Sequence, residues 1–136
     1  MTPQVAQIWQ VPSLLRILWA HHQSDGLRDV WVMLKVTARG WVRVIEDAKG
    51  PVGFAMRDDA RLHALYVHPR GQGAGVGRAL LMDAQSDTSA IDLWVRQTNR
   101  SARRFYSRHG FAEKLRAGPQ GAHILMVWPP ERRSMP

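Results

Sequence analysis

A glycine-rich turn between a predicted strand and a predicted helix carries the clearest chemistry in the sequence. The turn reads Gln72-Gly73-Ala74-Gly75-Val76-Gly77-Arg78 and follows the β-rich run Leu65-Tyr66-Val67. Glycines lack the Cβ atoms that would keep a ligand away from the backbone. Exposed N–H groups at a helix start, with the positive end of the helix dipole, suit an anion such as a pyrophosphate. The turn therefore predicts a phosphate-bearing ligand.

Two common phosphate-binding fingerprints do not fit this turn. A dinucleotide fingerprint that starts at Gly71 needs glycine where Val76 stands, and one that starts at Gly73 needs glycine where Arg78 stands. No Gly-Lys-Ser/Thr follows, so a Walker loop is excluded. The structural alternative is a flexible turn with incidental glycines, but the flanking strand and helix favour an anion site.

A second informative segment reads Asn99-Arg100-Ser101-Ala102-Arg103-Arg104-Phe105-Tyr106-Ser107-Arg108-His109-Gly110-Phe111. Asn99 is a good N-cap and Gly110 a natural stop, so a helix is predicted between them. Residues at spacings of three and four form its inward face: Ala102, Phe105, Tyr106 and His109. Taken alone, a tyrosine on such a face is more often a packing residue than a catalyst.

Both segments resemble the GCN5-related N-acetyltransferases, the GNAT family. The turn matches that family's Gln/Arg-x-x-Gly-x-Gly/Ala hallmark and follows the family-like Leu65-Tyr66-Val67-His68-Pro69. The later segment is similar to the family's Asn-x-x-Ala-x-x-Phe-Tyr-x-x-x-Gly-Phe pattern. The resemblance covers residues 41–128 and rests on two motifs in the expected order.

The resemblance implies roles for individual residues. The backbone of Leu65, Tyr66 and Val67 would pair with the pantetheine arm of acetyl-CoA, and N–H groups around Leu65 would serve as an oxyanion site. Amides of the turn would hold the pyrophosphate: Gln72, Gly73, Ala74, Gly75, Val76, Gly77 and Arg78. Tyr106 would protonate the departing thiolate, a transfer that ordinary pKa values make uphill by about 2 kcal/mol. Asn99 would contact the pantetheine or the acyl region.

The residue that would accept the proton of the amine is less clearly marked. Many GNAT members place a glutamate on the strand before the glycine turn, but residues 61–65 hold no carboxylate. His63 is the nearest titratable candidate, because imidazole exchanges a proton near neutral pH; it could equally be a strand residue that faces solvent. Glu46, Asp25 and Asp29 are alternatives that would attract a cationic amine or order a water.

Positive charge is concentrated in one stretch of the chain. The sequence has 19 basic and 11 acidic residues, a net charge of +8, and residues 96–116 hold seven of the basic and one of the acidic side chains. A patch of this size suits a phosphate-bearing ligand and is smaller than a usual duplex footprint. Arg100, Arg103 or Arg104 could reach a 3′-phosphate, and Arg103 enters the predicted cofactor-binding set; a solvated helix face is the alternative.

Several other classes of site have little support. The six histidines show no His-Glu-x-x-His pattern and the chain has no cysteine, so no metal site is expected. The absence of cysteine also excludes disulfides and a cysteine nucleophile, and it fits a cytoplasmic protein. No apolar run is long enough to span a bilayer, so no membrane partner is expected.

Hydrophobic periodicity predicts the elements that position these residues. Helices are expected at residues 5–19 with a break at Pro12, 25–39 with Ser24 as a cap, 75–85 and 99–109. Strands are expected at residues 41–47, 52–56, 62–67, 91–95, 111–115 and 123–128. This order predicts an α/β (α+β) fold with a mixed, mostly antiparallel sheet flanked by helices, as in GNAT-like acyl-CoA acyltransferases. The family's first strand is expected to be missing or very short.

The sequence as a whole predicts an acetyl-CoA-dependent N-acetyltransferase. Residues 1–128 would form its single domain and residues 129–136 a loose C-terminal tail. A primary amine of a small molecule or peptide would attack acetyl-CoA directly in a ternary complex, without a covalent enzyme intermediate. The alternatives are a non-catalytic acyl-CoA sensor and, with less support, a nucleic-acid-binding module. A homodimer stays open.

Overall fold

The fold is one seven-stranded sheet covered by helices on both faces. The structure, a computed structural model, describes residues 1–131. The strands are β1 Gln4–Val5, β2 Val42–Asp47, β3 Gly50–Asp58, β4 Arg61–Val67, β5 Ile91–Arg96, β6 Ala112–Ala117 and β7 His123–Trp128. The helices are α1 Val11–Trp19, α2 Leu27–Ala38, α3 Val76–Asp87 and α4 Arg100–Arg108, with short 3-10 turns at Ile8–Gln10, Pro69–Gly71 and Pro119–Gly121. The predicted fold class is confirmed.

The strand order is β1-β2-β3-β4-β5-β7-β6, and every neighbouring pair is antiparallel except β4 and β5. Two apolar clusters lie on opposite faces of this sheet. In one, Leu14 of α1 and Met33 of α2 pack with Phe54 of β3. In the other, Leu80 of α3 and Tyr106 of α4 belong to a cluster that includes residues of β2 to β5 and β7. The helices thus divide into a pair on each face.

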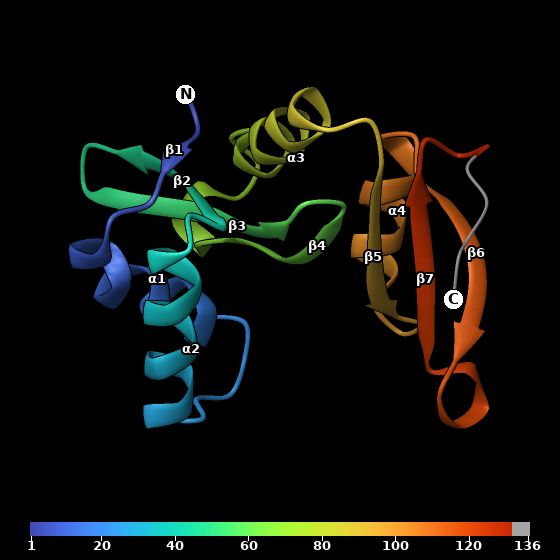
Figure 1. Ribbon diagram of the computed structural model, residues 1–136, viewed down its shortest axis with the longest axis horizontal. Helices are drawn as coiled ribbons and strands as arrows, with labels where there is room; N and C mark the ends of the chain where they lie inside the picture. Colours follow the sequence, from blue (N-terminus) through green and yellow to red (C-terminus); the bar gives the residue numbers. More distant parts are fainter. Residues whose placement is uncertain (132–136) are drawn as a thin grey trace.

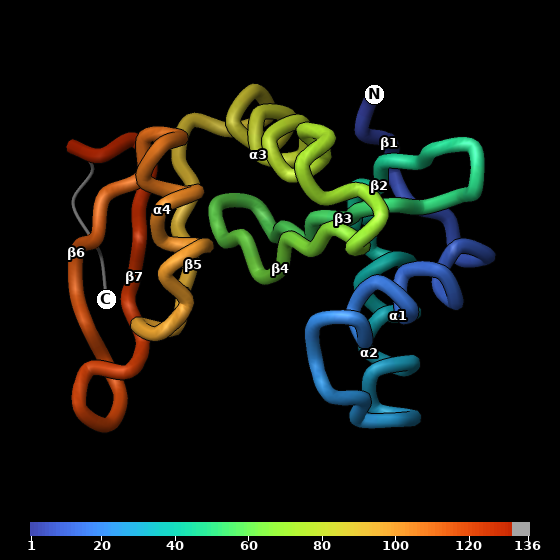
Figure 2. The backbone as a smooth tube through the Cα atoms, turned by 180° about the vertical axis from the view of Figure 1, so that it is seen from behind, coloured from blue at the N-terminus to red at the C-terminus, as the bar shows by residue number. Residues whose placement is uncertain are grey.

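The sheet changes direction between β4 and β5. Their only matched register pair among the described residues is Arg61 with Asp92. The Asp92 amide donates to the Ala60 carbonyl at 2.8 Å, and the side chains of Arg61 and Asp92 form an ion pair. Beyond this point the two strands separate, so that the β1–β4 half and the β5–β7 half stand at a wide angle (Figures 1 and 2).

The N-terminal elements agree with the prediction in one respect, a very short first strand, and differ from it in two. The first strand is present but has two residues, Gln4 and Val5, which pair with β2. Pro12 does not break a helix but lies in the first turn of α1, where its missing N–H costs no hydrogen bond. Ser24 does not cap α2; its hydroxyl accepts from the Gly26 amide at 3.1 Å, and Gly26 is the cap.

Turns between the strands are shifted by one or two residues. β3 begins at Gly50, so Gly50 and Pro51 belong to the strand rather than to the turn before it. Pro51 pairs with Glu46 at a register shift, where its missing N–H is tolerated. Of the tail expected at residues 129–136, residues 132–136 lie outside the described residues. Within residues 1–131, no helix combines the length and the apolar character that a bilayer crossing requires.

Candidate functional site

The edge of β4 that faces β5 presents backbone groups with no strand partner. His68 donates its amide to the Val52 carbonyl on the β3 side at 2.8 Å. Successive residues of a strand direct their N–H and C=O groups to opposite sides. Tyr66, two residues before His68, therefore also bonds toward β3, where it is in register with Phe54. Leu65 and Val67 therefore direct their N–H and C=O groups toward β5.

The facing edge of β5 is exposed in the same way. Asp92 directs its amide to β4, and Gln97 directs its amide to Ala122 on the β7 side at 2.8 Å. By the same alternation, the backbone groups of Trp94 and the Arg96 amide face β4, while the Arg96 carbonyl accepts the Asn99 amide at 2.9 Å. Since the β4–β5 ladder stops at Asp92, an extended ligand arm in the gap would find donors and acceptors on both sides.

Packing fixes the first half of the glycine turn. His68 accepts the Arg70 amide through Nδ1 at 3.1 Å, and the Arg70 guanidinium donates to Asp47 at 3.1 and 3.3 Å. Gly71 is buried, and a Cβ there would lie 2.4 Å from Val52 Cγ2. Glycine at position 71 is therefore needed for packing and not for a ligand.

The second half of the turn is open. Gly73 and Gly75 have φ values of +81° and +83°, and a Cβ on either would meet nothing within 4 Å. Gly75 is the N-cap of α3. Among the described residues, the amides of Gly75, Val76, Gly77 and Arg78 donate to no protein acceptor. Four free amides at the start of a helix of 12 residues have the geometry that can bind an anion, and the anion site predicted from the sequence stays a prediction.

Gly77 is the point at which three elements meet. A Cβ at Gly77 would lie 3.6 Å from Phe105 Cζ of α4, 3.6 Å from Val67 Cγ2 and 3.7 Å from Leu65 Cδ2 of β4. The free amides of α3 thus begin beside the two residues whose backbone faces the gap. A ligand with an anionic end and an extended arm fits this continuity.

Helix α4 forms as its sequence predicts, with Asn99 as its N-cap and Tyr106 in its last turn. Asn99 accepts the Ala102 amide through Oδ1 at 3.1 Å, which leaves its Nδ2 group free to donate. The Tyr106 ring is 9% exposed and packs edge-on against Phe105 and Phe111, at centroid distances of 5.2 and 5.4 Å.

The Tyr106 hydroxyl is protonated at neutral pH. Burial, with a smaller contribution from Tyr66, raises the pKa of Tyr106 above its usual value. Within residues 1–131 this hydroxyl forms no hydrogen bond. It is also not among the fully enclosed side-chain nitrogen and oxygen atoms that lack a hydrogen-bond partner there, of which Thr37 Oγ1 is the one example. The hydroxyl can therefore donate a proton, although its raised pKa makes transfer to a thiolate harder than the ordinary values suggest.

His63, the candidate proton acceptor, lies where β4 carries a register shift opposite Met56 and Arg57. Its ring stacks on Trp41 at 5.8 Å between centroids, and its Nε2 is 3.6 Å from Asp58 Oδ2. Trp41 packs with the cluster under α1 and α2, so His63 is on that face of the sheet. We call this face, with the α1–α2 loop, the acceptor side.

The acidic alternatives are tied to other groups. Asp29 accepts the Trp19 indole N–H at 2.8 Å and the Asp25 amide at 2.7 Å through Oδ2, and these hydrogen bonds lower the pKa of Asp29. Glu46 accepts from the Gln10 side chain. The described residues contain no cluster of three or more histidine, aspartate or glutamate side chains that could hold a metal ion.

One histidine of the acceptor side is not among the site residues predicted from the sequence. His21, in the loop between α1 and α2, contacts the Val67 carbonyl through Nε2 at 2.5 Å and stacks on Tyr66 at 5.7 Å. The sequence holds no signal for this contact, because 46 positions separate His21 from Val67.

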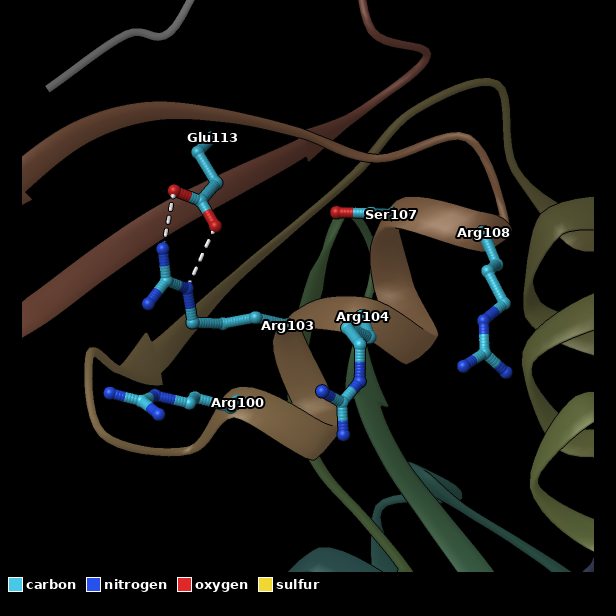
Figure 3. Close-up of a pocket in the computed structure, with 6 residues that line it drawn as sticks. All are labelled: Arg100, Arg103, Arg104, Ser107, Arg108 and Glu113. Carbon is cyan, nitrogen blue, oxygen red and sulfur yellow. Dashed lines mark hydrogen bonds and ion pairs between the residues drawn. The ribbon is translucent and has the colours of Figure 1, made fainter.

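Arginines line a shallow pocket along α4 (Figure 3): Arg100, Arg103, Arg104 and Arg108, with Ser107 and Glu113. Arg103 forms two hydrogen bonds to Glu113, at 2.8 and 3.1 Å, and one to the Gln97 carbonyl at 2.9 Å. Arg100 and Arg104 point away from Glu113 and have no such partner within the described part of the chain. Arg103 can reach a phosphate only by leaving Glu113, whereas Arg100 and Arg104 are available.

Comparison with known proteins agrees with this arrangement. Residues 36–113 match the acetyltransferase (GNAT) domain. Over 71 residues the chain is 37% identical to peptidyl-lysine N-acetyltransferase YjaB of Escherichia coli strain K12, a match that covers 52% of this chain and 48% of YjaB. The chain thus spans about half the length of this curated relative.

Solved structures show the same fold. An acetyltransferase of the GNAT family from Bacillus cereus ATCC 10987 superposes with a TM-score of 0.81 at 18% identity, covering 96% of this chain and 98% of that one. The PaiA N-acetyltransferase of Thermoplasma acidophilum, solved in complex with coenzyme A, gives 0.71 at 18% identity and covers 92% and 96%.

Proposed function

This chain belongs to the GNAT acetyltransferase domain family, and from that premise we propose that it transfers the acetyl group of acetyl-CoA to a primary amine. One observation carries the proposal: the backbone edge of β4 at Leu65 and Val67, which has no strand partner, runs into the free amides at the start of α3. A thioester on an extended amide-containing arm, with a pyrophosphate at its other end, matches both parts.

The proposed donor site uses backbone groups. Leu65 binds the pantetheine arm with its N–H and C=O groups and Val67 with its N–H group, because the Val67 carbonyl already accepts from His21 and Gln72. Tyr66, whose backbone bonds toward β3, contributes its side chain. The pyrophosphate lies on the four amides from Gly75 to Arg78. The Gln72 and Ala74 amides, which the sequence places in the same set, instead donate to the Pro69 and Gly71 carbonyls. Asn99 reaches the arm with its free Nδ2 group.

The proposed reaction is direct attack. The amine nitrogen bonds to the thioester carbon, whose oxygen accepts from the Leu65 amide as charge develops. The carbon–sulfur bond breaks, and Tyr106 gives its proton to the thiolate. The proton lost by the amine goes to a base on the acceptor side, for which His63 is the candidate named from the sequence. No covalent enzyme intermediate forms.

The class of acceptor is proposed from a relative. Because the E. coli relative is named a peptidyl-lysine N-acetyltransferase, we take the ε-amino group of a peptide lysine as the first candidate, with small-molecule amines as the second. We also propose that residues 1–128 act as one domain and that the protein is cytoplasmic.

Calorimetry with acetyl-CoA, followed by a thiol-release assay over lysine peptides and small amines, tests the function. The expected result is binding of acetyl-CoA and thiol release that depends on an amine. Binding without turnover for any amine would favour the acyl-CoA sensor. Binding of duplex DNA with a steep salt dependence, and none of acetyl-CoA, would favour the nucleic-acid module.

A further inference from the structure

His21 lies at the mouth of the proposed acyl site, although no motif contains it. Its Nε2 is 2.5 Å from the Val67 carbonyl oxygen. A carbonyl only accepts, so Nε2 must carry the hydrogen. In a neutral imidazole with that tautomer, Nδ1 keeps a lone pair and can take up a proton. The backbone thus holds His21 in the form that a general base requires.

The position of the ring follows from two contacts. His21 stacks on the Tyr66 side chain with an angle of 19° between the rings, on the acceptor side of β4. Val67 is two residues from Leu65, about 7 Å along a strand. An imidazole and one hydrogen-bonded water cover that distance, and a base that acts through one water is within the usual range.

His63 occupies the opposite end of the same strand. It lies two residues before Leu65, close to Arg61 and Asp92, where β4 and β5 are still joined. His21 lies where the strands have parted, and its side chain is exposed, so a proton can pass from it to solvent. The two histidines therefore border the closed and the open end of the gap.

We infer that His21, held by the Val67 carbonyl, is the base that takes the proton from the attacking amine. This inference rests on the proposed function. As the new carbon–nitrogen bond forms and the carbon–sulfur bond breaks, one proton leaves the amine nitrogen and passes through a water to His21 Nδ1, and from there to solvent. The thiolate receives its own proton from Tyr106, which regains one from solvent, so the products are an amide and the free thiol.

The test compares four variants of the full chain: H21Q, H21A, H22Q and H63Q. H21Q keeps a side-chain N–H for the Val67 carbonyl but has no group that titrates, whereas H21A loses both. H22Q is the matched control, because the adjacent His22 contacts the Gln23 carbonyl at 3.0 Å within its own loop. Tyr66 of β4 stacks on the His21 ring, His22 is next to it in the chain, and the Gln72 amide that shares the Val67 carbonyl is neutral.

For H21Q and H21A, kcat with a lysine peptide should fall about 10²-fold at neutral pH. The acidic limb of the pH profile of kcat should disappear, and acetyl-CoA affinity should stay at the parent level. H22Q should keep the parent profile. Added imidazole should restore part of the turnover of H21A.

Two results would overturn the inference while leaving the proposed function intact. If H21Q turns over like the parent and H21A does not, the Val67 contact positions the loop and His21 is no base. If H63Q loses the acidic limb and H21Q keeps it, the proton goes to His63. A parent protein that neither binds acetyl-CoA nor releases thiol refutes the proposed function itself.

Discussion

The two sides of the gap between β4 and β5 differ in what holds them in place: backbone groups on one side and side chains on the other. On the proposed cofactor side, the groups that would face the ligand are backbone amides of β4 and α3, placed by strand pairing and by two glycines in left-handed conformation, Gly73 and Gly75. On the acceptor side, the α1–α2 loop is held by side chains, with Asp29 bonded to Trp19 and His21 bonded to the Val67 carbonyl. A site made of backbone groups needs particular residue types at fixed spacing, which leaves a motif in the sequence. A site made of side chains needs only that residues distant in the sequence come together in the fold.

Tyr106→Phe gives the largest expected effect and tests whether the cofactor side performs chemistry beyond binding. The change keeps the ring packing against Phe105 and Phe111 and removes a hydroxyl that has no hydrogen-bond partner within residues 1–131. Turnover should fall by about 10² to 10⁴ if a general acid is lost. Steady-state kinetics with calorimetry measures both kcat and acetyl-CoA affinity.

Two controls accompany Tyr106→Phe. Thermal denaturation should shift by less than the equivalent of about 0.5 kcal/mol, since no buried hydrogen bond is broken. The rate loss should shrink for an acyl donor whose thiol is more acidic, because a better leaving group needs less protonation. Equal turnover of variant and parent, where chemistry limits the rate, would leave Tyr106 as a packing residue.

A matched pair of glycines tests the anion site of the cofactor side. Gly75 and Gly40 have φ values of +83° and +76°, and a Cβ on either meets nothing within 4 Å. Alanine should therefore cost about 1 kcal/mol of stability at both positions, because left-handed backbone is strained for any side chain.

Only Gly75→Ala should weaken acetyl-CoA binding, by about tenfold, or 1.4 kcal/mol. Calorimetry on both variants, with denaturant unfolding alongside, separates binding from stability. A bulky residue such as valine is a poor choice here, since the left-handed φ of Gly75 would strain the fold as well as block the ligand. Equal affinity losses at positions 40 and 75 would mean that the effect comes from stability.

The sequence predicts the local parts of this fold and misses the contacts between distant parts. The cap at Asn99 and the left-handed Gly110 follow from residue types within one helix, and both are confirmed. The pairing of Arg103 with Glu113 and the contact of His21 with Val67 depend on how β6 and the α1–α2 loop are placed. Periodicity cannot indicate such a contact, because it reports which face of an element is apolar and not what lies opposite.

Neighbouring arginines on α4 test how far the cofactor side extends. Arg104 has no ion-pair partner among the described residues, whereas Arg103 is bonded to Glu113 and Gln97. Arg104→Ala should weaken CoA binding about fivefold and leave dephospho-CoA binding unchanged, if its guanidinium reaches the 3′-phosphate. Arg103→Ala should affect the two ligands equally. If Arg103→Ala instead weakened the binding of CoA but not of dephospho-CoA, then Arg103, the residue predicted from the sequence, would contact the 3′-phosphate.

The smallest expected effect concerns the acceptor side alone. Asp29 accepts the Asp25 amide and the Trp19 indole, and these hydrogen bonds hold the pKa of its carboxyl below the usual range for aspartate. A carboxyl whose pKa is lowered by folding stabilises the folded form above its ordinary pKa, and that contribution is lost as the pH falls through the lowered value. The α1–α2 loop should therefore loosen below about pH 4, while the backbone-built cofactor side does not respond.

Amide hydrogen exchange can follow this loosening at a single group, the Asp25 N–H that donates to Asp29. Its protection should fall a few-fold as the pH drops below about 4, after correction for the intrinsic pH dependence of exchange, while the amides of β4 that bond to β3 keep theirs. Asp29→Asn is the matched control, because the amide oxygen can still accept but does not titrate, and its Asp25 N–H should show no step. If β4 lost protection at the same pH as Asp25, the two sides would unfold as one unit, and the division between a side-chain-held loop and a backbone-built cofactor site would fail.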